Sequence, residues 1–282
     1  MRALTVTIAL GTLAAAPLMS QDMRHASAAR QRSQESDLSV TVTFGVGRLQ
    51  VRPGPEDVLY RARLQYDAER FEPILRYSPE GRRVRVGIEG LNRGGDLNYR
   101  DRPEQRLDLD LSPAVPTDLE LTYGAGLADI ELGGLSLTRI QVKAGAAESV
   151  IRFSRPNQVK CEALTFEVGA INLKAEGLGN ARCGRIDLKG AAGDITLDFT
   201  GAWPANTTVA VDLKVGLGSV RLRLPANVGV SVDIDRVLAS FDRTGLLRRG
   251  SRYYSANYDA ASTKLDFQVG TAMGHVEVEW VK

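Results

Sequence analysis

Apolar and polar residues alternate along most of the chain from Leu38 onward, with little sign of a helical period. Every second side chain falls on the same face in short runs such as "LSVTVTF", "LDLDLS", "INLKAEG" and "HVEVEWV". Gly, Pro and Asn separate these runs, which are rich in β-branched residues. Such runs, divided by turn-forming residues, are typical of β-strands joined by tight turns. The pattern therefore predicts an all-β fold.

One element recurs along the predicted strands: an apolar residue, two further residues and a glycine, then a short link and a new alternating run. It appears as "LTYGAGLADIEL", "VKAGAAESVIRF", "FEVGAINLKA", "LKGAAGDITLDF" and "LKVGLGSVRLRL". These begin at positions 121, 142, 166, 188 and 213, so the steps are 21, 24, 22 and 25 residues. A repeat of this length predicts a solenoid-like, stacked-rung β-sheet in which neighbouring repeats bury one another. A sandwich of hairpins is the alternative.

The only two cysteines, Cys161 and Cys183, are separated by the repeat length. Aligned at that offset of 22, the two segments also match four apolar pairs: Leu164 with Ile186, Phe166 with Leu188, Leu173 with Ile195, and Ala175 with Leu197. Neighbouring strands lie about 4.8 Å apart, which a disulfide can span. We therefore predict adjacent rungs joined by a disulfide, as an oxidising compartment would favour. Two buried free thiols are the alternative.

The first 28 residues are predicted to be a secretory signal peptide. Arg2 precedes a mostly apolar run, Ala3 to Met19, and Ala26-Ser27-Ala28 offers small residues at a cleavage site. A retained N-terminal anchor is the alternative. The polar segment 29–37 is predicted to be a flexible lead-in. No later run reaches 18 apolar residues, so we expect an exported chain without a transmembrane segment after cleavage.

The C-terminal half contains "VGLGSVRLRLP", "VGVSV", "YSANY" and a closing "VGTAMGHVEV", in that order. Together these motifs resemble the C-terminal domain of the LiaF-like, cell-wall-active-antibiotic response proteins. The stretch from "LSVTVTFGVGRLQV" to "VRVGIEG" is similar to the N-terminal module that accompanies such toast-rack domains. The resemblance implies an N-terminal β module (38–112) and a toast-rack, LiaF-like β-solenoid domain (113–282). It also implies the periplasm or cell surface of a bacterium, and roles in adhesion-like contact, scaffolding or envelope-stress sensing.

Composition and charge exclude several classes of function. The 36 Lys and Arg residues nearly balance the 34 Asp and Glu residues, so nucleic acid is not a predicted partner. His25 lies in the predicted signal peptide, which leaves His275 as the only histidine for acid–base chemistry. One histidine and two paired cysteines do not supply a zinc site. The sequence therefore predicts no catalytic, cofactor-binding or metal-binding residue, and no enzyme.

Paired carboxylates are the best case for the opposite reading. Two acidic residues can cleave a glycoside, and the candidates on a β-helix are Asp108, Asp110, Asp187, Asp194 and Asp198. Each alternates with apolar neighbours, as in "LDLDL" and "RIDLKG", which is typical of the solvated face of a half-buried sheet. A carbohydrate-active enzyme stays open as an alternative function, and so does a lipid- or headgroup-binding protein.

Two basic stretches are candidates for binding. The first, "RYSPEGRRVRV", places Arg76, Arg82, Arg83 and Arg85 around a Ser-Pro-Glu-Gly turn. The second, "RTGLLRRGSRYYSANY", contains Leu246, Leu247, Arg243, Arg248, Arg249, Arg252, Tyr253, Tyr254 and Tyr258. Arginine with tyrosine can bind anionic glycans, lipid headgroups or proteins, although surface arginines also simply keep sheets soluble. Because exposed leucines suggest contact, we predict that the second stretch binds an envelope protein, glycan or lipid surface.

Overall fold

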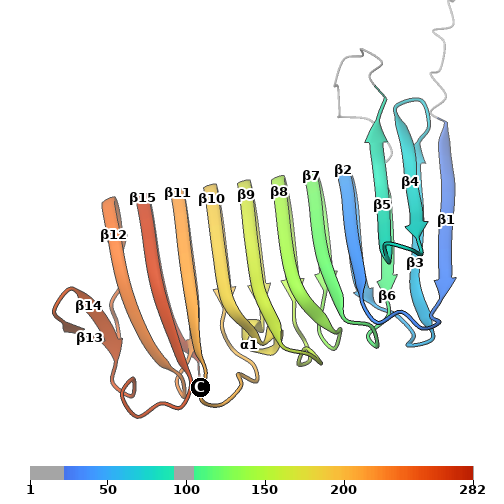
Figure 1. The fold of residues 1–282 in the computed structure, drawn as a ribbon. Helices are drawn as coiled ribbons and strands as arrows, with labels where there is room; N and C mark the ends of the chain where they lie inside the picture. The colour runs from blue at the N-terminus through green and yellow to red at the C-terminus, as the bar shows by residue number, and fades with distance from the viewer. Residues whose placement is uncertain (1–21, 92–104, 282) are drawn as a thin grey trace, which may run out of the picture.

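The computed structural model describes residues 22–91 and 105–281, and 15 strands in them form one sheet (Figure 1). In chain order the strands are β1 (Met23–Gln31), β2 (Leu38–Pro53), β3 (Val58–Asp67), β4 (Phe71–Ser78), β5 (Arg83–Gly90), β6 (Arg106–Leu111), β7 (Thr117–Glu131), β8 (Leu137–Arg152), β9 (Cys161–Glu176), β10 (Cys183–Asp198), β11 (Thr208–Pro225), β12 (Gly229–Phe241), β13 (Leu246–Arg249), β14 (Arg252–Ser255) and β15 (Lys264–Val281). One short helix, α1 (Leu178–Ala181), precedes β10. The all-β prediction is confirmed. Within these residues no helix is long and apolar enough to cross a membrane.

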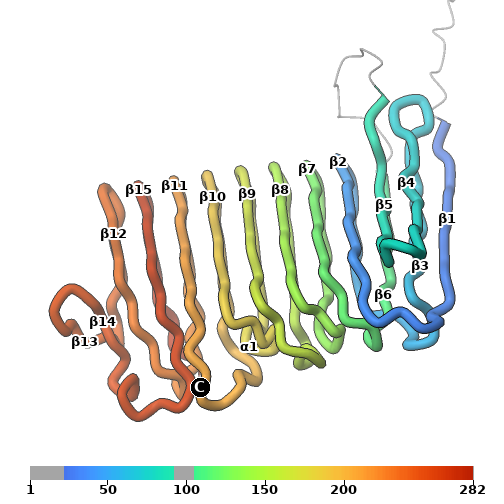
Figure 2. The backbone as a smooth tube through the Cα atoms, viewed as in Figure 1, coloured from blue at the N-terminus to red at the C-terminus, as the bar shows by residue number. Residues whose placement is uncertain are grey.

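The centre of the molecule is a row of eight long parallel strands, in the order β2-β7-β8-β9-β10-β11-β15-β12. A straight strand of 16 residues would span about 50 Å. Yet five residues separate the end of β7 at Glu131 from the start of β8 at Leu137, and so short a link reaches less than about 20 Å. Each long strand must therefore fold back on itself, and Figure 2 shows the resulting stack of bent rungs.

Glycines make the bends possible. Gly126 and Gly218 have φ values of 120° and 131°, a region that residues with a Cβ rarely adopt. A Cβ on Gly218 would also lie 1.9 Å from the carbonyl oxygen of Gly193 on the preceding rung. The glycine of each repeat therefore serves both the bend and the close stacking of rungs.

The core fills the space between the two limbs of each bent strand. Phe199, at the end of one rung, meets the ring of Phe267, near the start of another, at a centroid distance of 5.0 Å. The buried Tyr123 hydroxyl likewise lies 3.0 Å from Ser149 Oγ across the core. Inward positions on both limbs are apolar and almost fully buried. The alternating pattern is thus explained by two sheet layers that share one interior.

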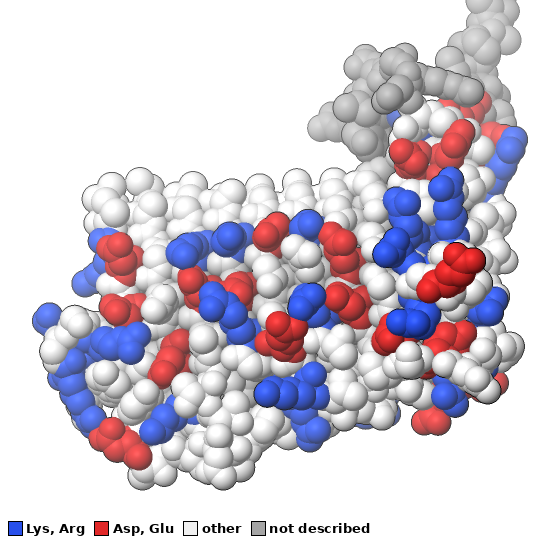
Figure 3. All heavy atoms as spheres, in the orientation of Figure 1, with Lys and Arg blue, Asp and Glu red and all other residues white. Residues whose placement is uncertain are grey.

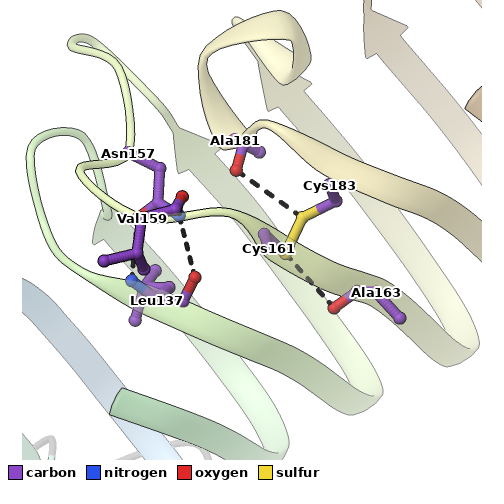
Figure 4. Close-up of a disulfide and its surroundings, with 7 residues drawn as sticks. All are labelled: Leu137, Asn157, Val159, Cys161, Ala163, Ala181 and Cys183. Carbon is purple, nitrogen blue, oxygen red and sulfur yellow. Dashed lines mark hydrogen bonds between the residues drawn. A yellow bond between two sulfur atoms is a disulfide. The ribbon is translucent and has the colours of Figure 1, made fainter. Parts of the chain in front are cut away.

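The predicted register is confirmed in full. Cys161 pairs with Cys183, and the four predicted apolar pairs occupy matching positions on β9 and β10. A disulfide joins the two cysteines (Figure 4). Beside it the buried Asn157 amide holds two neighbouring turns together, because its Oδ1 accepts from Leu137 N and its Nδ2 donates to Leu137 O and Val159 O.

The N-terminal end departs from the repeat. The first limb of β2 pairs with β5, which pairs with β4, whereas the second limb pairs with β6, then β3 and β1. The two layers are therefore extended by different strands. Because β2 also pairs with β7 over 13 positions, the predicted boundary between residues 112 and 113 lies inside one continuous core.

Strand β1 contains the predicted cleavage point after Ala28 and the first residues of the predicted lead-in, 29–37. Residues 23–31 pair with β3 over nine positions, so Ala28 lies inside a strand and Ala29–Gln31 are ordered. Ala26 and Ala28 pack against the core. The segment shows no clear alternation of apolar and polar residues, which is why the sequence did not predict a strand here. The apolar run itself lies outside the described residues.

Candidate functional site

Each of the five candidate carboxylates contacts an arginine or a serine, and the five do not line a shared groove. Asp110 is buried and accepts from Arg52 Nε at 2.7 Å, and Asp198 is held by Arg223 at 2.6 Å. Asp108 and Asp187 pair with the arginine two residues before each of them, and Asp194 accepts from the Ser219 hydroxyl. The bonds of Asp110, Asp198 and Asp194 join different strands, whereas those of Asp108 and Asp187 lie within one strand. Among the described residues no group of three acidic, histidine or cysteine side chains could hold a metal ion.

His275 lies on an exposed face near a serine and an aspartate. Its Nδ1 is 2.7 Å from Ser240 Oγ on the adjacent rung β12. Asp242, however, accepts from the backbone and hydroxyl of Thr244, and these hydrogen bonds lower the pKa of its carboxyl group. A catalytic triad needs the aspartate to orient the histidine. Ser240 and His275 therefore form a contact between adjacent rungs, which the sequence spacing did not indicate.

The second basic stretch forms an antiparallel hairpin, β13–β14, at the end of the row opposite to β1 (Figure 1). The rings of Tyr253 and Phe241 meet edge to face at 5.4 Å, and those of Tyr254 and Tyr258 meet at 4.9 Å. The Tyr258 hydroxyl donates to Asp266 on β15 at 2.8 Å. Burial, followed by this bond, raises the pKa of Tyr258, so the hydroxyl stays a donor. The tyrosines therefore attach the hairpin to the rungs.

The arginines of this hairpin divide into two groups. Arg249 pairs with Asp259 at 2.7 Å and lies over the Tyr254 ring, and Arg252 pairs with Asp233 at 3.5 Å. Arg243 and Arg248 are exposed and have no carboxylate partner within the described parts of the chain. Leu247 is 57% exposed, whereas its neighbour Leu246 is buried. We call Arg243, Leu247 and Arg248 the cap residues.

The first basic stretch lies on β4 and β5, at the other end of the molecule. Arg82 pairs with Asp37 at 2.7 Å. Arg76 and Arg85 occupy directly opposite positions on the two strands, and Arg83 lies two residues before Arg85. Figure 3 shows basic side chains gathered over these strands.

The bends form an uncharged ridge, which sequence reasoning missed. One residue per rung lies on it: Val46, Ala125, Ala146, Ala170, Ala192, Leu217, Met273 and Leu238. Leu217, Met273 and Leu238 share one register position and are 51%, 48% and 69% exposed. The uncharged upper edge in Figure 3 is this ridge. The sequence could have indicated this ridge, because the eight residues at the bends are all nonpolar.

Two models of protein families match the chain. The N-terminal domain of toast_rack matches residues 19–174, and the C-terminal domain of the cell wall-active antibiotics response protein LiaF matches residues 178–278. The first match ends within β9 and the second begins at α1. No curated protein sequence matches significantly.

Several solved structures are similar in arrangement. A candidate cell adhesion protein from Clostridium sporogenes is 15% identical, with a TM-score of 0.46, over 92% of this chain and 100% of that one. A candidate adhesin from Bacteroides fragilis is 10% identical, with a TM-score of 0.41, over 90% and 97%. A candidate lipid binding protein from Parabacteroides distasonis is 11% identical, with a TM-score of 0.25, over 92% and 97%. The first family model alone covers more than half of the residues, and the chain therefore belongs to the toast-rack family, with a LiaF-like C-terminal region.

Proposed function

We propose that this protein is an exported, non-enzymatic module of the bacterial envelope that works by contact, in an adhesin-like or scaffolding role. Export is supported by the apolar run near the N-terminus and by the disulfide, which an oxidising compartment maintains. A contact role, as opposed to catalysis, is supported by the candidate carboxylates on the sheet faces, because arginines and a serine already bind them.

The proposal rests on two properties of the cap residues: their arginines have no acidic partner among the described residues, and their leucine is exposed. Arg243 and Arg248 lack acidic partners among the described residues, and Leu247 is exposed on a hairpin whose tyrosines anchor it to the rungs. An exposed apolar side chain together with guanidinium groups that have no carboxylate partner among the described residues is typical of a contact surface, because arginine is enriched there and can bind carboxylate, phosphate or aromatic groups. We propose that the cap residues contact an envelope protein, glycan or lipid surface.

Crosslinking in the native envelope tests this proposal. A photoreactive amino acid at position 247, in the full-length exported chain, should capture one defined partner that mass spectrometry identifies. The same group at Asn172, an exposed position on the middle rung β9, is the matched control and should capture none. Replacing Arg243 and Arg248 by glutamate should abolish the specific product without changing the thermal stability.

The choice of arginines matters. Arg249→Ala or Tyr254→Ala would also disturb the hairpin, since both side chains have internal partners. Arg243 and Arg248 have no ion pair to lose. Identical products at positions 247 and 172, or an unchanged product after the double charge reversal, would overturn the proposal.

A further inference from the structure

Three arginines lie together on the outer face of β4 and β5 without a counter-charge. Arg76 and Arg85 are directly opposite in the antiparallel pair, so their Cα atoms are about 5 Å apart. Arg83 is two residues from Arg85 and therefore projects from the same face. All three are exposed, and none has an ion pair or hydrogen bond from its side chain to another described residue.

This arrangement differs from the one on rungs β7 to β9. On the neighbouring rungs, cations are matched with carboxylates: Arg139 pairs with Asp118 and Glu162, and Lys143 pairs with Glu120. Like charges directly opposite each other destabilise a sheet. A face that only needed to be soluble could mix the two signs, as β7 to β9 do.

The acidic residues of the same two strands are also segregated. Glu72 lies directly opposite Glu89, on the same face as Arg76 and Arg85, and it comes four positions before Arg76 in β4. Two carboxylates and three guanidinium groups are thus placed on one strand pair without pairing with each other. Figure 3 shows the acidic and basic groups as separate clusters in this part of the molecule. An anion from outside the chain would relieve the repulsion between Arg76 and Arg85.

We infer that Arg76, Arg83 and Arg85 form a binding site for phosphate groups carried by an envelope polymer or by lipid headgroups. A guanidinium fork donates two parallel hydrogen bonds to one oxyanion. The oxygens of a phosphate group are arranged tetrahedrally, so two or three arginines can approach it from different sides, whereas the two oxygens of a carboxylate lie in one plane. The site is an open strand surface, which fits a group displayed on a polymer or a membrane.

The site is independent of the proposed contact at the cap residues. Strands β4 and β5 lie at the opposite end of the row from β13 and β14 (Figure 1). Variants at one end should therefore leave binding at the other end unchanged, and failure of either proposal can be recognised separately.

The test compares two double variants of the full-length protein on the same strands. Arg76→Gln with Arg85→Gln removes the basic pair, and Glu72→Gln with Glu89→Gln removes the acidic pair as a matched control. Binding is measured to soluble polyphosphate, to phosphatidylglycerol vesicles, to phosphatidylcholine vesicles and to the carboxylate polymer polygalacturonate. The thermal midpoint of each variant is recorded in parallel.

We expect the arginine variant to bind at least one anionic phosphate probe at least tenfold more weakly. Its midpoint should stay unchanged or rise by about 1–3 °C, because a repulsive cross-strand pair has been removed. The glutamate variant should show a similar midpoint and unchanged or tighter binding. Loss of affinity without loss of stability is a result that a structural role for these arginines would not produce.

The probes distinguish the source of the phosphate. Binding to polyphosphate alone indicates a polymer, and binding to phosphatidylglycerol but not phosphatidylcholine vesicles without polyphosphate binding indicates a lipid headgroup. Both support the inference when the arginine variant abolishes them. Equal binding of polygalacturonate, unchanged affinity in the arginine variant, or no binding to any phosphate probe would overturn it.

Discussion

Gly218→Ala should be among the most damaging small substitutions in this protein. Gly218 lies at the bend of β11 with a φ of 131°, and an added Cβ would be 1.9 Å from Gly193 O and 2.9 Å from Gly193 N. Both contacts are with backbone, so no side chain can rotate away. Either φ must leave its native value or the rungs β10 and β11 must separate at the bend.

The two ways of accommodating alanine have comparable costs. A residue forced into such a φ region costs about 1–3 kcal/mol, and each ladder hydrogen bond lost on separation costs about 1 kcal/mol. We therefore expect a loss of about 3 kcal/mol or more in the free energy of unfolding. For a chain of this size that corresponds to a fall of about 6–12 °C in the thermal midpoint.

Gly45→Ala is the matched control for this substitution. Gly45 belongs to the bend of β2, yet a Cβ there would have no atom within 4 Å, so the change should stay within about 0.5 kcal/mol. Urea unfolding followed by far-UV circular dichroism and by the fluorescence of Trp203 and Trp280 measures both. If Gly218→Ala is as stable as Gly45→Ala, the argument that backbone contact between rungs requires glycine is wrong.

Three further predictions concern the disulfide, a buried tyrosine and the first strand. Replacing Cys161 and Cys183 by serine should lower the free energy of unfolding by about 3 kcal/mol, since the bridge closes a loop of 22 residues; iodoacetamide should label neither cysteine in the unfolded, unreduced wild-type protein. Burial raises the pKa of Tyr123 to about 12, above the unfolded value of about 10. The stability that comes from this raised pKa is therefore complete below pH 10 and is lost, to the extent of about 3 kcal/mol, as the pH rises from 10 to 12; Tyr123→Phe should make the free energy of urea unfolding less dependent on pH over that range. A chain that starts at residue 29 loses most of β1 and should unfold at a lower urea concentration than one that starts at residue 22; equal midpoints would mean that β1 adds no stability.

The register of the rungs could be predicted because identical side-chain spacing recurs at one offset. The pairing of Cys161 with Cys183 needed only that offset and the distance between strands. The fold-back of each strand was harder to foresee, because apolar alternation continues through the bend and does not mark the change of layer. It becomes evident once five residues must connect the parallel strands β7 and β8.

The sequence predicted which residues make up the candidate sites, but it did not predict which of them are exposed and which hold the fold together. Tyr253, Tyr254 and Tyr258 are aromatic residues in a basic loop, and local sequence does not reveal that Phe241 and Asp266 engage two of them. The exposure of Leu247 agrees with the expectation of an exposed leucine, whereas Leu246 is buried. Contacts between distant segments decide these roles, and they arise only when the chain is folded.

The outer face of the stacked rungs explains why both candidate sites lie at the ends. In the middle of the row each rung has a neighbour on both sides, and opposite charges can be matched across it, as Arg152 is matched with Asp129 and Glu176. At the ends the repeat stops, and the strands there are held by other means: core packing under β4 and aromatic contacts under β14. Charges on those strands need no partner from the next rung. The terminal surfaces are therefore the places where unmatched arginines can persist, and where a partner outside the chain can supply the missing charge.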